Sequence, residues 1–102
     1  MLSIDNLKNF CKLHKDEEFT GIGGASVYSL WNFEEIEELN KGYEVEKFIP
    51  GFIAFGTDGG GKMLAVKKGT GEVYSVPFIP MEEKSADKLA ENLDEFLKLK
   101  KV

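Results

Sequence analysis

The chain has 102 residues, of which 42% are hydrophobic and 30% are charged, and its formal net charge is -5. This length and composition predict one folded domain over residues 1–102 rather than a disordered chain. The acidic balance argues against direct binding to nucleic acid, whose backbone is itself densely anionic. No apolar run approaches the roughly 20 residues that cross a bilayer, and the start lacks the order of a secretion signal, so we expect a cytoplasmic protein without membrane contact.

The first predicted element is an amphipathic helix over residues 4–14, whose apolar side chains recur at helical spacing. Ser3 can cap its N-terminus. The stretch 21–26 (GIGGAS) holds three glycines in four positions, which rules out a regular helix and favours a tight turn. Residues 27–31 then predict a strand.

A second helix is predicted over residues 33–40. Asn32 and Glu35 have the spacing of a capping box, in which each side chain bonds the backbone of the other residue. Trp31 can pack on Ile36 as a hydrophobic staple across the start of the helix. The boundary of this helix is therefore well marked.

Gly42 follows this helix and supplies a C-terminal stop. Residues 43–48 alternate between two sets of side chains, which weakly predicts a strand. Residues 52–55 (FIAF) are apolar without alternation, so we expect a central strand that is covered on both faces.

Two further extended segments, residues 63–67 and 72–78, are joined by a glycine-rich turn at 68–71, which predicts a β-hairpin. Pro77 lacks the amide hydrogen that a central strand needs. We therefore expect the second of these strands to lie at an edge of the sheet or to contain a bulge.

The last predicted element is a helix capped by Ser85, with lysines near its end, where the helix dipole favours cations. Its apolar face comprises Leu89, Leu93, Phe96 and Leu97. The order of elements predicts an α+β fold in a single domain. In it, a mostly antiparallel, twisted sheet of about five strands packs with N-terminal, middle and C-terminal helices.

The stretch 56–62 (GTDGGGK) matches the opening of a phosphate-binding loop, but Met63 stands where that motif requires Ser or Thr. A phosphate loop also needs a helix after it, whereas an extended segment follows here. Only Asp58 could serve as a calcium ligand of the helix-loop-helix type. We therefore expect a sharp reversal between strands, with Asp58 capping free amides, and no bound cofactor.

Cys11 and His14 are three residues apart, so a helix would place a thiol and an imidazole on one face, as in an activated nucleophile. Both also share the apolar stripe of the first helix. The simpler interpretation makes Cys11 a buried core residue and His14 a boundary residue. One cysteine and one histidine cannot by themselves form a zinc site, so we expect no metal centre. With the simpler interpretation of this pair, we also expect no enzyme.

Several motifs occur in a fixed order between residues 22 and 97: LW-x-x-EEI-x-x-LN, PGFIAFGTDGGG, GEVY, PFIP and DEFL. Together they resemble the SUKH superfamily, which includes the yeast cell-wall assembly regulator domain and many immunity proteins of bacterial toxin systems. Members usually carry a longer N-terminal helical region with an NGG turn, whose place GIGG takes here. The resemblance implies an α+β domain that binds other proteins and has no catalytic residues.

The expected partner is a cognate protein, and a basic toxin, often a nuclease, would suit the acidic charge. The candidate partner-binding residues are Glu34, Glu35, Glu37, Glu38 and Asp58. The alternatives are a regulatory scaffold with a non-toxin partner, and a small enzyme or nucleotide binder that uses GTDGGGK or the Cys11 and His14 pair. We expect a monomer or a weak homodimer, since the strand at 72–78 could leave an open sheet edge.

Overall fold

A six-stranded sheet runs through the residues that the structure, a computed structural model, describes: 2–21 and 26–100. The strands are β1 Glu18–Thr20, β2 Val27–Leu30, β3 Phe52–Thr57, β4 Lys62–Lys67, β5 Val73–Pro77 and β6 Asp87–Ala90. The helices are α1 Ile4–Leu13, α2 Ile36–Gly42, α3 Val45–Phe48 and α4 Leu93–Leu97, with a 3-10 turn η2 at Glu83–Ser85. The strands lie in chain order and all pair antiparallel. The predicted single α+β domain is confirmed, with six strands in place of about five.

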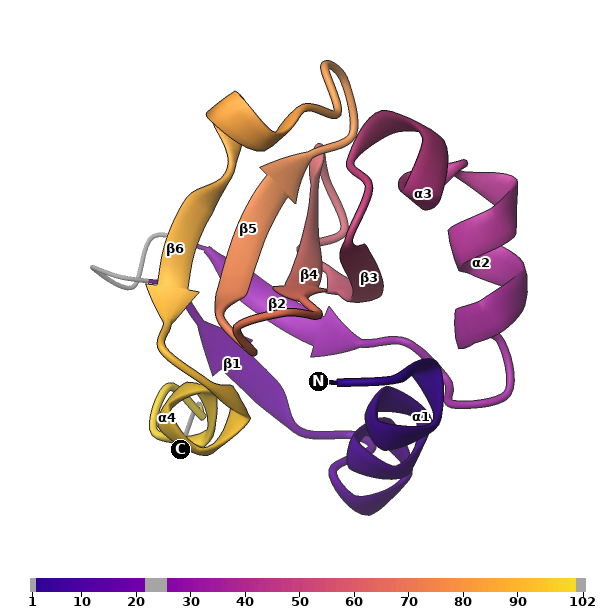
Figure 1. Cartoon of the computed structure of the whole chain (residues 1–102). Coiled ribbons are helices and arrows are strands. Elements are labelled where there is room, and N and C mark those ends of the chain that lie inside the picture. The colour runs from indigo at the N-terminus through magenta and orange to yellow at the C-terminus, as the bar shows by residue number, and fades with distance from the viewer. Residues whose placement is uncertain (1, 22–25, 101–102) are drawn as a thin grey trace.

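The sheet curls so that strands far apart in its order meet (Figure 1). The Tyr28 hydroxyl in β2 lies 2.7 Å from Ser75 Oγ in β5, and both side chains are buried. At the outer edge of β1, the Thr20 amide donates a hydrogen bond of 2.9 Å to the Leu99 carbonyl oxygen. The segment after α4 therefore covers that edge of the sheet.

The central strand β3 is buried on both faces, as its apolar run predicts. Ile53 and Phe55 enter one hydrophobic cluster, whereas Phe52 and Ala54 enter another. This division follows from the alternation of side chains along a strand. The first cluster packs beneath α1 and α4, and the second packs beneath α3.

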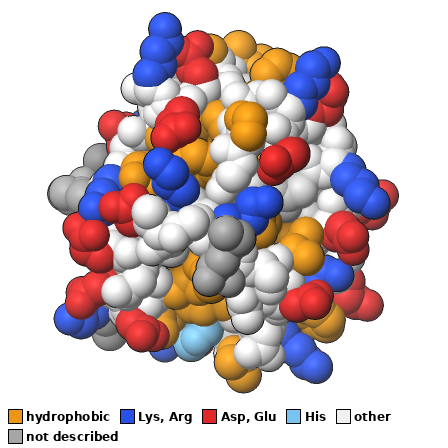
Figure 2. Space-filling view, in the orientation of Figure 1, with side chains coloured by type: hydrophobic (Ala, Val, Ile, Leu, Met, Phe, Trp, Pro, Cys, Tyr) orange, Lys and Arg blue, Asp and Glu red, His pale blue; other side chains and the backbone are white. Residues whose placement is uncertain are grey.

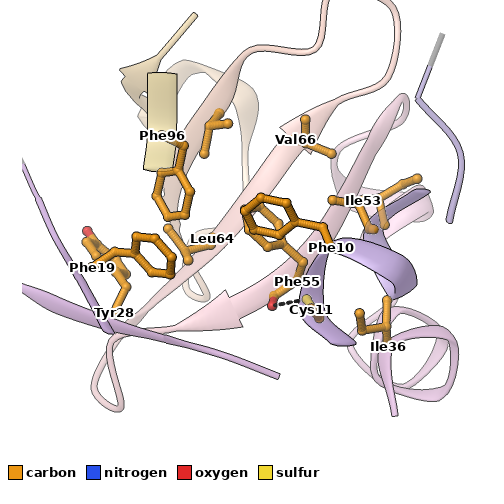
Figure 3. Packing of buried hydrophobic residues seen from close by; sticks show 12 residues of the cluster. Phe10, Cys11, Phe19, Tyr28, Ile36, Ile53, Phe55, Leu64, Val66 and Phe96 are labelled. Carbon is orange, nitrogen blue, oxygen red and sulfur yellow. Dashed lines mark hydrogen bonds between the residues drawn. The ribbon is translucent and has the colours of Figure 1, made fainter. Parts of the chain in front are cut away.

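Aromatic rings form the centre of the first cluster (Figure 3). The Phe55 ring meets the rings of Phe10 and Phe96 edge-on, at centroid distances of 6.1 Å and 5.8 Å. Phe19 stacks on the other side of Phe96 at 4.5 Å. These contacts join α1, α4 and β1 to the middle of the sheet.

Several local predictions are confirmed. Ser3 forms a capping box with Asn6 at the start of α1, and β2 and the hairpin of β4 and β5 lie where the sequence places them. Residues 22–25 of the predicted GIGGAS turn lie outside the described residues.

The strand predicted at residues 43–48 is wrong, because α3 occupies most of this segment. Val45 and Ile49 are four residues apart and each is 1% exposed, so both bury on one helical face against the sheet. Glu44 takes a left-handed conformation, with φ of 55°, and separates α3 from α2. The helical spacing of Val45 and Ile49 therefore determines the structure of this segment, and the alternation of side chains at 43–48 does not.

The C-terminal helix predicted to begin after Ser85 is wrong in its first half, where the chain forms β6. The pairing of this segment with β5 overrides its local helix propensity, because β6 supplies hydrogen-bond partners to the outer side of β5. Lys88 in β6 also pairs with Glu72, at 2.7 Å. The helix starts only after Asn92, whose Oδ1 accepts a hydrogen bond of 2.8 Å from the Glu95 amide.

Two boundaries also differ from prediction. Asn32 Oδ1 accepts a hydrogen bond from the Glu34 amide and forms a turn, so α2 begins three residues later than expected and includes Gly42 as its last residue. Of the two alternatives that Pro77 predicts, the sheet edge is wrong, because β5 lies between β4 and β6, but the pairing of β5 with β6 is irregular, with a register shift between Val73 and Tyr74. Pro77 is tolerated there because β6 pairs with β5 only as far as Ser75.

Candidate protein-interaction surface

The stretch 56–62 forms the tip of the hairpin that joins β3 to β4. Asp58 Oδ1 accepts hydrogen bonds from the amides of Gly60, at 2.8 Å, and Lys62, at 3.1 Å. Gly59 has φ of +78°, a conformation that favours glycine. The predicted turn and the capping role of Asp58 are confirmed. A strand follows the loop, so no helix N-terminus faces the place where a phosphate would lie.

Cys11 is a core residue, as predicted, with an exposure of 1%. Its Sγ donates a weak hydrogen bond of 3.7 Å to the Phe55 carbonyl oxygen (Figure 3). Burial raises the pKa of the Cys11 thiol to about 12, so the reactive thiolate is scarce at neutral pH. His14 is half-buried at the boundary, and its Nδ1 lies 3.2 Å from both carboxylate oxygens of Glu17. The pair thus lacks the activated thiolate that nucleophilic chemistry requires.

Four of the predicted partner-binding residues, Glu34, Glu35, Glu37 and Glu38, form an exposed surface that we call the acidic face. Glu37 makes an ion pair of 3.4 Å with Lys8 of α1. Within residues 2–21 and 26–100, the other three carboxylates have no ion pair or hydrogen bond. Their charges therefore remain available to a partner.

The Asn40 side chain fixes α2, and with it the acidic face, to the sheet. Its amide nitrogen donates to the carbonyl oxygens of Ile36, at 2.8 Å, and Ala54, at 2.9 Å. Its oxygen accepts a hydrogen bond of 2.8 Å from the Ala54 amide. Sequence reasoning missed this role, although Asn40 lies one helical turn after the buried Ile36 and therefore on the inner side of α2.

Asp58, the fifth predicted partner-binding residue, lies on the hairpin loop rather than on α2. Its Oδ1 already accepts hydrogen bonds from amides of its own turn. No contact in the described part of the chain joins it to the acidic face. The structure thus groups the four glutamates but does not add Asp58 to them.

An apolar groove of about 590 Å³, which the sequence did not predict, lies beside the C-terminal end of α2. Gly42, Tyr43, Phe48 and the segment 78–82 line it, and we call it the apolar groove. Ile79 is 91% exposed, Phe48 51% and Tyr43 44%, which is unusual for side chains of this kind. Hydrophobic side chains reach the surface at the top of Figure 2, where Figure 1 shows the loop after β5 beside α3.

A row of aromatic rings connects this groove to the start of α2. The Tyr43 ring packs on Phe78 at a centroid distance of 4.8 Å and stacks on Trp31 at 6.0 Å. Trp31 in turn contacts both hydrophobic clusters of the core. The wall of the groove is therefore anchored in the core, whereas Ile79 and Phe48 extend into solvent.

A second hollow, of about 610 Å³, lies between the start of α1 and the segment of α2 and α3. Four of its charged groups pair with one another: Lys47 lies 3.5 Å from Glu44, and Lys68 lies 3.7 Å from Glu46. These internal pairs leave less charge for a partner than the acidic face does.

Residues 5–99 match the SMI1 / KNR4 family (SUKH-1). The chain belongs to this family. The match covers all of the described helices and strands except the first residue of α1, so the suspected SUKH membership is confirmed. No curated protein sequence matches the chain.

Two further features bear on the function of this SUKH-1 protein. Among residues 2–21 and 26–100, no helix has the length and apolar character that crossing a membrane requires. In the same residues, the histidine, cysteine and acidic side chains form no group of three or more that could hold a metal ion.

Proposed function

We propose that this SUKH-1 protein is a cytoplasmic protein-binding module, an immunity protein that neutralises a cognate bacterial toxin by covering its active surface. Membership of SUKH-1 supports the class of function, because the wider SUKH superfamily includes immunity proteins. The observation that carries the proposal is the acidic face, where Glu34, Glu35 and Glu38 have no ionic partner in the described part of the chain.

The charge of this surface suits a toxin that acts on nucleic acid. Such an enzyme needs a basic surface to hold a phosphate backbone, and an acidic protein can occupy the same surface. Glu34, Glu35 and Glu38 break no internal ion pair when a partner binds. Their attraction to a basic partner therefore favours the complex without an opposing loss. Electrostatic steering also makes association fast and sensitive to salt. The acting species is a monomer or a weak homodimer, although the strand at 72–78 does not supply the open edge expected for a homodimer, because β5 lies between β4 and β6.

Capture of the partner from the source organism, followed by a growth assay, tests this proposal. The captured protein is expressed in a host cell with and without this chain. We expect the partner alone to stop growth and the chain to restore it. We also expect the affinity of the purified pair to fall at least tenfold between about 0.05 and about 0.5 M salt, because screening weakens exposed charges. A harmless partner, or an affinity indifferent to salt, contradicts the proposal.

A matched pair of variants isolates the contribution of the acidic face. The test variant carries Glu34→Gln, Glu35→Gln and Glu38→Gln. The control variant removes the same charge with Asp87→Asn, Glu91→Gln and Asp94→Asn, which are exposed on β6, directly after it and at the start of α4, away from α2 (Figure 1). Asp87 and Glu91 have exposed ion pairs, with Lys62 and Lys88, of the kind that contribute little to stability. We expect the test variant to lose protection and the control to keep it. Equal loss in both variants would show that net charge, and not this face, matters.

A further inference from the structure

We propose that the apolar groove receives a hydrophobic side chain of the partner, presented between lysines or arginines, and so acts as the anchor site of the interface. This inference deepens the proposed function and rests on it for the identity of the partner as a toxin. It names the chemistry of the contacting segment, which is a basic peptide stretch with an aliphatic or aromatic residue at its centre.

The hydrophobic side chains that border the apolar groove are exposed to solvent. Ile79 is 91% exposed and Phe48 51%, and both border a hollow large enough for a bulky side chain. Burying such surfaces releases free energy in proportion to the apolar area covered. Aromatic and aliphatic side chains that enter well-packed pockets supply most of the energy of many protein interfaces.

The segment beside the apolar groove has a negative net charge, which favours a basic segment of the partner. Residues 34–48 hold six glutamates and two lysines, so this one segment carries most of the net charge of the chain. The segment forms the acidic face at one end and borders the groove, through Tyr43 and Phe48, at the other. Glu82 lies in the opposite wall, where it pairs with Lys84 at 3.3 Å, so the negative charge beside the groove comes from the segment 34–48. A partner that fills the groove therefore meets negative potential beside it.

The same charge argues against a second copy of this chain as the occupant. Paired by a two-fold axis, two grooves would bring two acidic segments together. Like charges across an interface oppose association. A basic partner removes this repulsion and gains attraction in its place.

A short peptide tests the groove without any toxin. The probe has the sequence lysine, lysine, phenylalanine, leucine, lysine, lysine, with both termini blocked. Trp31 is the single tryptophan of the chain and stacks on Tyr43 at the groove, so its fluorescence reports occupancy. One control peptide replaces phenylalanine and leucine by serine, and a second replaces the lysines by glutamate. We expect a saturable change in Trp31 fluorescence with the probe and at least tenfold weaker binding of either control.

Three variants of the full chain locate the site. Ile79→Ser and Phe48→Ser remove exposed apolar surface from the groove and should each weaken the probe at least fivefold. Leu13→Ser is the matched control, because Leu13 is 68% exposed at the end of α1 and does not line the groove. Its affinity for the probe should equal that of the unmodified chain.

Three results would overturn the inference: no saturable signal with the probe, equal binding of a control peptide, or equal loss in Leu13→Ser. A concentration-dependent dimer that Ile79→Ser dissociates would also overturn it, since the occupant would then be a second copy. The two proposals fail separately. If Ile79→Ser and Phe48→Ser still protect cells against a captured toxin, the groove is not the anchor. If the peptide results hold but the captured partner is harmless, only the toxin assignment fails.

Discussion

Gly56 of β3 lies directly against Ser29 of β2. A β-carbon at Gly56 would stand 2.6 Å from the Ser29 carbonyl oxygen and 2.9 Å from Cδ1 of Leu64, both too close for ordinary contact. This crowding coincides with a register shift between Ala54 and Gly56, where β3 pairs with β4. The first glycine of the GTDGGGK stretch is therefore required by the close approach of strands, not by a ligand.

We predict that Gly56→Ala lowers the free energy of unfolding by about 2 kcal/mol or more, because the backbone of β2 must move to admit the methyl group. Urea denaturation measures the change. Gly69→Ala is the control, since a β-carbon there meets no atom within 4 Å and the backbone of Gly69 does not have a positive φ. Equal stability of the Gly56→Ala variant and the unmodified chain would contradict the role given to Gly56.

Asn40 provides a second prediction. Asn40→Ala removes both hydrogen bonds that the side chain makes with the Ala54 backbone, and should lower the free energy of unfolding by about 2 kcal/mol. Hydrogen exchange should show faster exchange of the Ala54 amide in this variant. Lys41→Ala, at the next and exposed position, should leave both quantities nearly unchanged. Slow exchange at Ala54 in the Asn40→Ala variant would show that α2 is held by other contacts.

The Glu72 carboxylate makes stability depend on pH in the acid range. Hydrogen bonds from Lys88, Tyr74 and Thr70 lower the pKa of Glu72 from its ordinary value of 4.5 to about 2. Because the folded state holds this carboxylate ionised, the stabilisation is complete above the unfolded pKa. It declines as pH falls from 4.5 towards about 2.

Glu72→Gln tests this dependence, with unfolding free energies measured in urea at several pH values. The variant should lose stability near neutral pH and show a shallower decline below about pH 4.5 than the unmodified chain. Glu83→Gln is a suitable control, because Glu83 is an exposed acid with a single ion pair, to Lys67. An unchanged acid profile in the Glu72→Gln variant would contradict the assignment.

Cys11 should resist thiol reagents in the folded protein. Burial excludes the reagent, and the raised pKa of about 12 keeps the sulfur protonated. Labelling with a chromogenic disulfide at neutral pH should be slow in buffer and fast in concentrated urea. The rate in buffer should follow the population of open molecules rather than reagent access to a surface thiol. Fast labelling under native conditions would show that the α1 side of the core opens readily.

The sequence predicts well those elements whose signal is local. The cap at Ser3, the apolar run at 52–55 and the glycine turn at 68–71 each determine their own structure, and all three are confirmed. The segments at 43–48 and 87–90 depend on distant contacts. Val45 becomes helical by packing beneath the sheet, and β6 forms because β5 offers an edge.

The candidate surface divides in the same way. Helical spacing alone indicates that Glu34, Glu35, Glu37 and Glu38 face solvent, as they do. The apolar groove could not be predicted, because its walls are Tyr43 and Phe48 on one side and residues 78–82 on the other, about a third of the domain apart in sequence. The signal that was present, PFIP, indicated only an apolar segment near a strand end.

The attachment of α2 through Asn40 and Ile36 separates what holds the helix from what it displays. Both anchoring residues face inward, while Glu34, Glu35 and Glu38 contribute nothing to the assembly of the sheet. Replacing those outward side chains would therefore redirect recognition and leave folding almost untouched. A scaffold divided in this manner can acquire new binding specificity through a few substitutions on one short helix and the turn that precedes it.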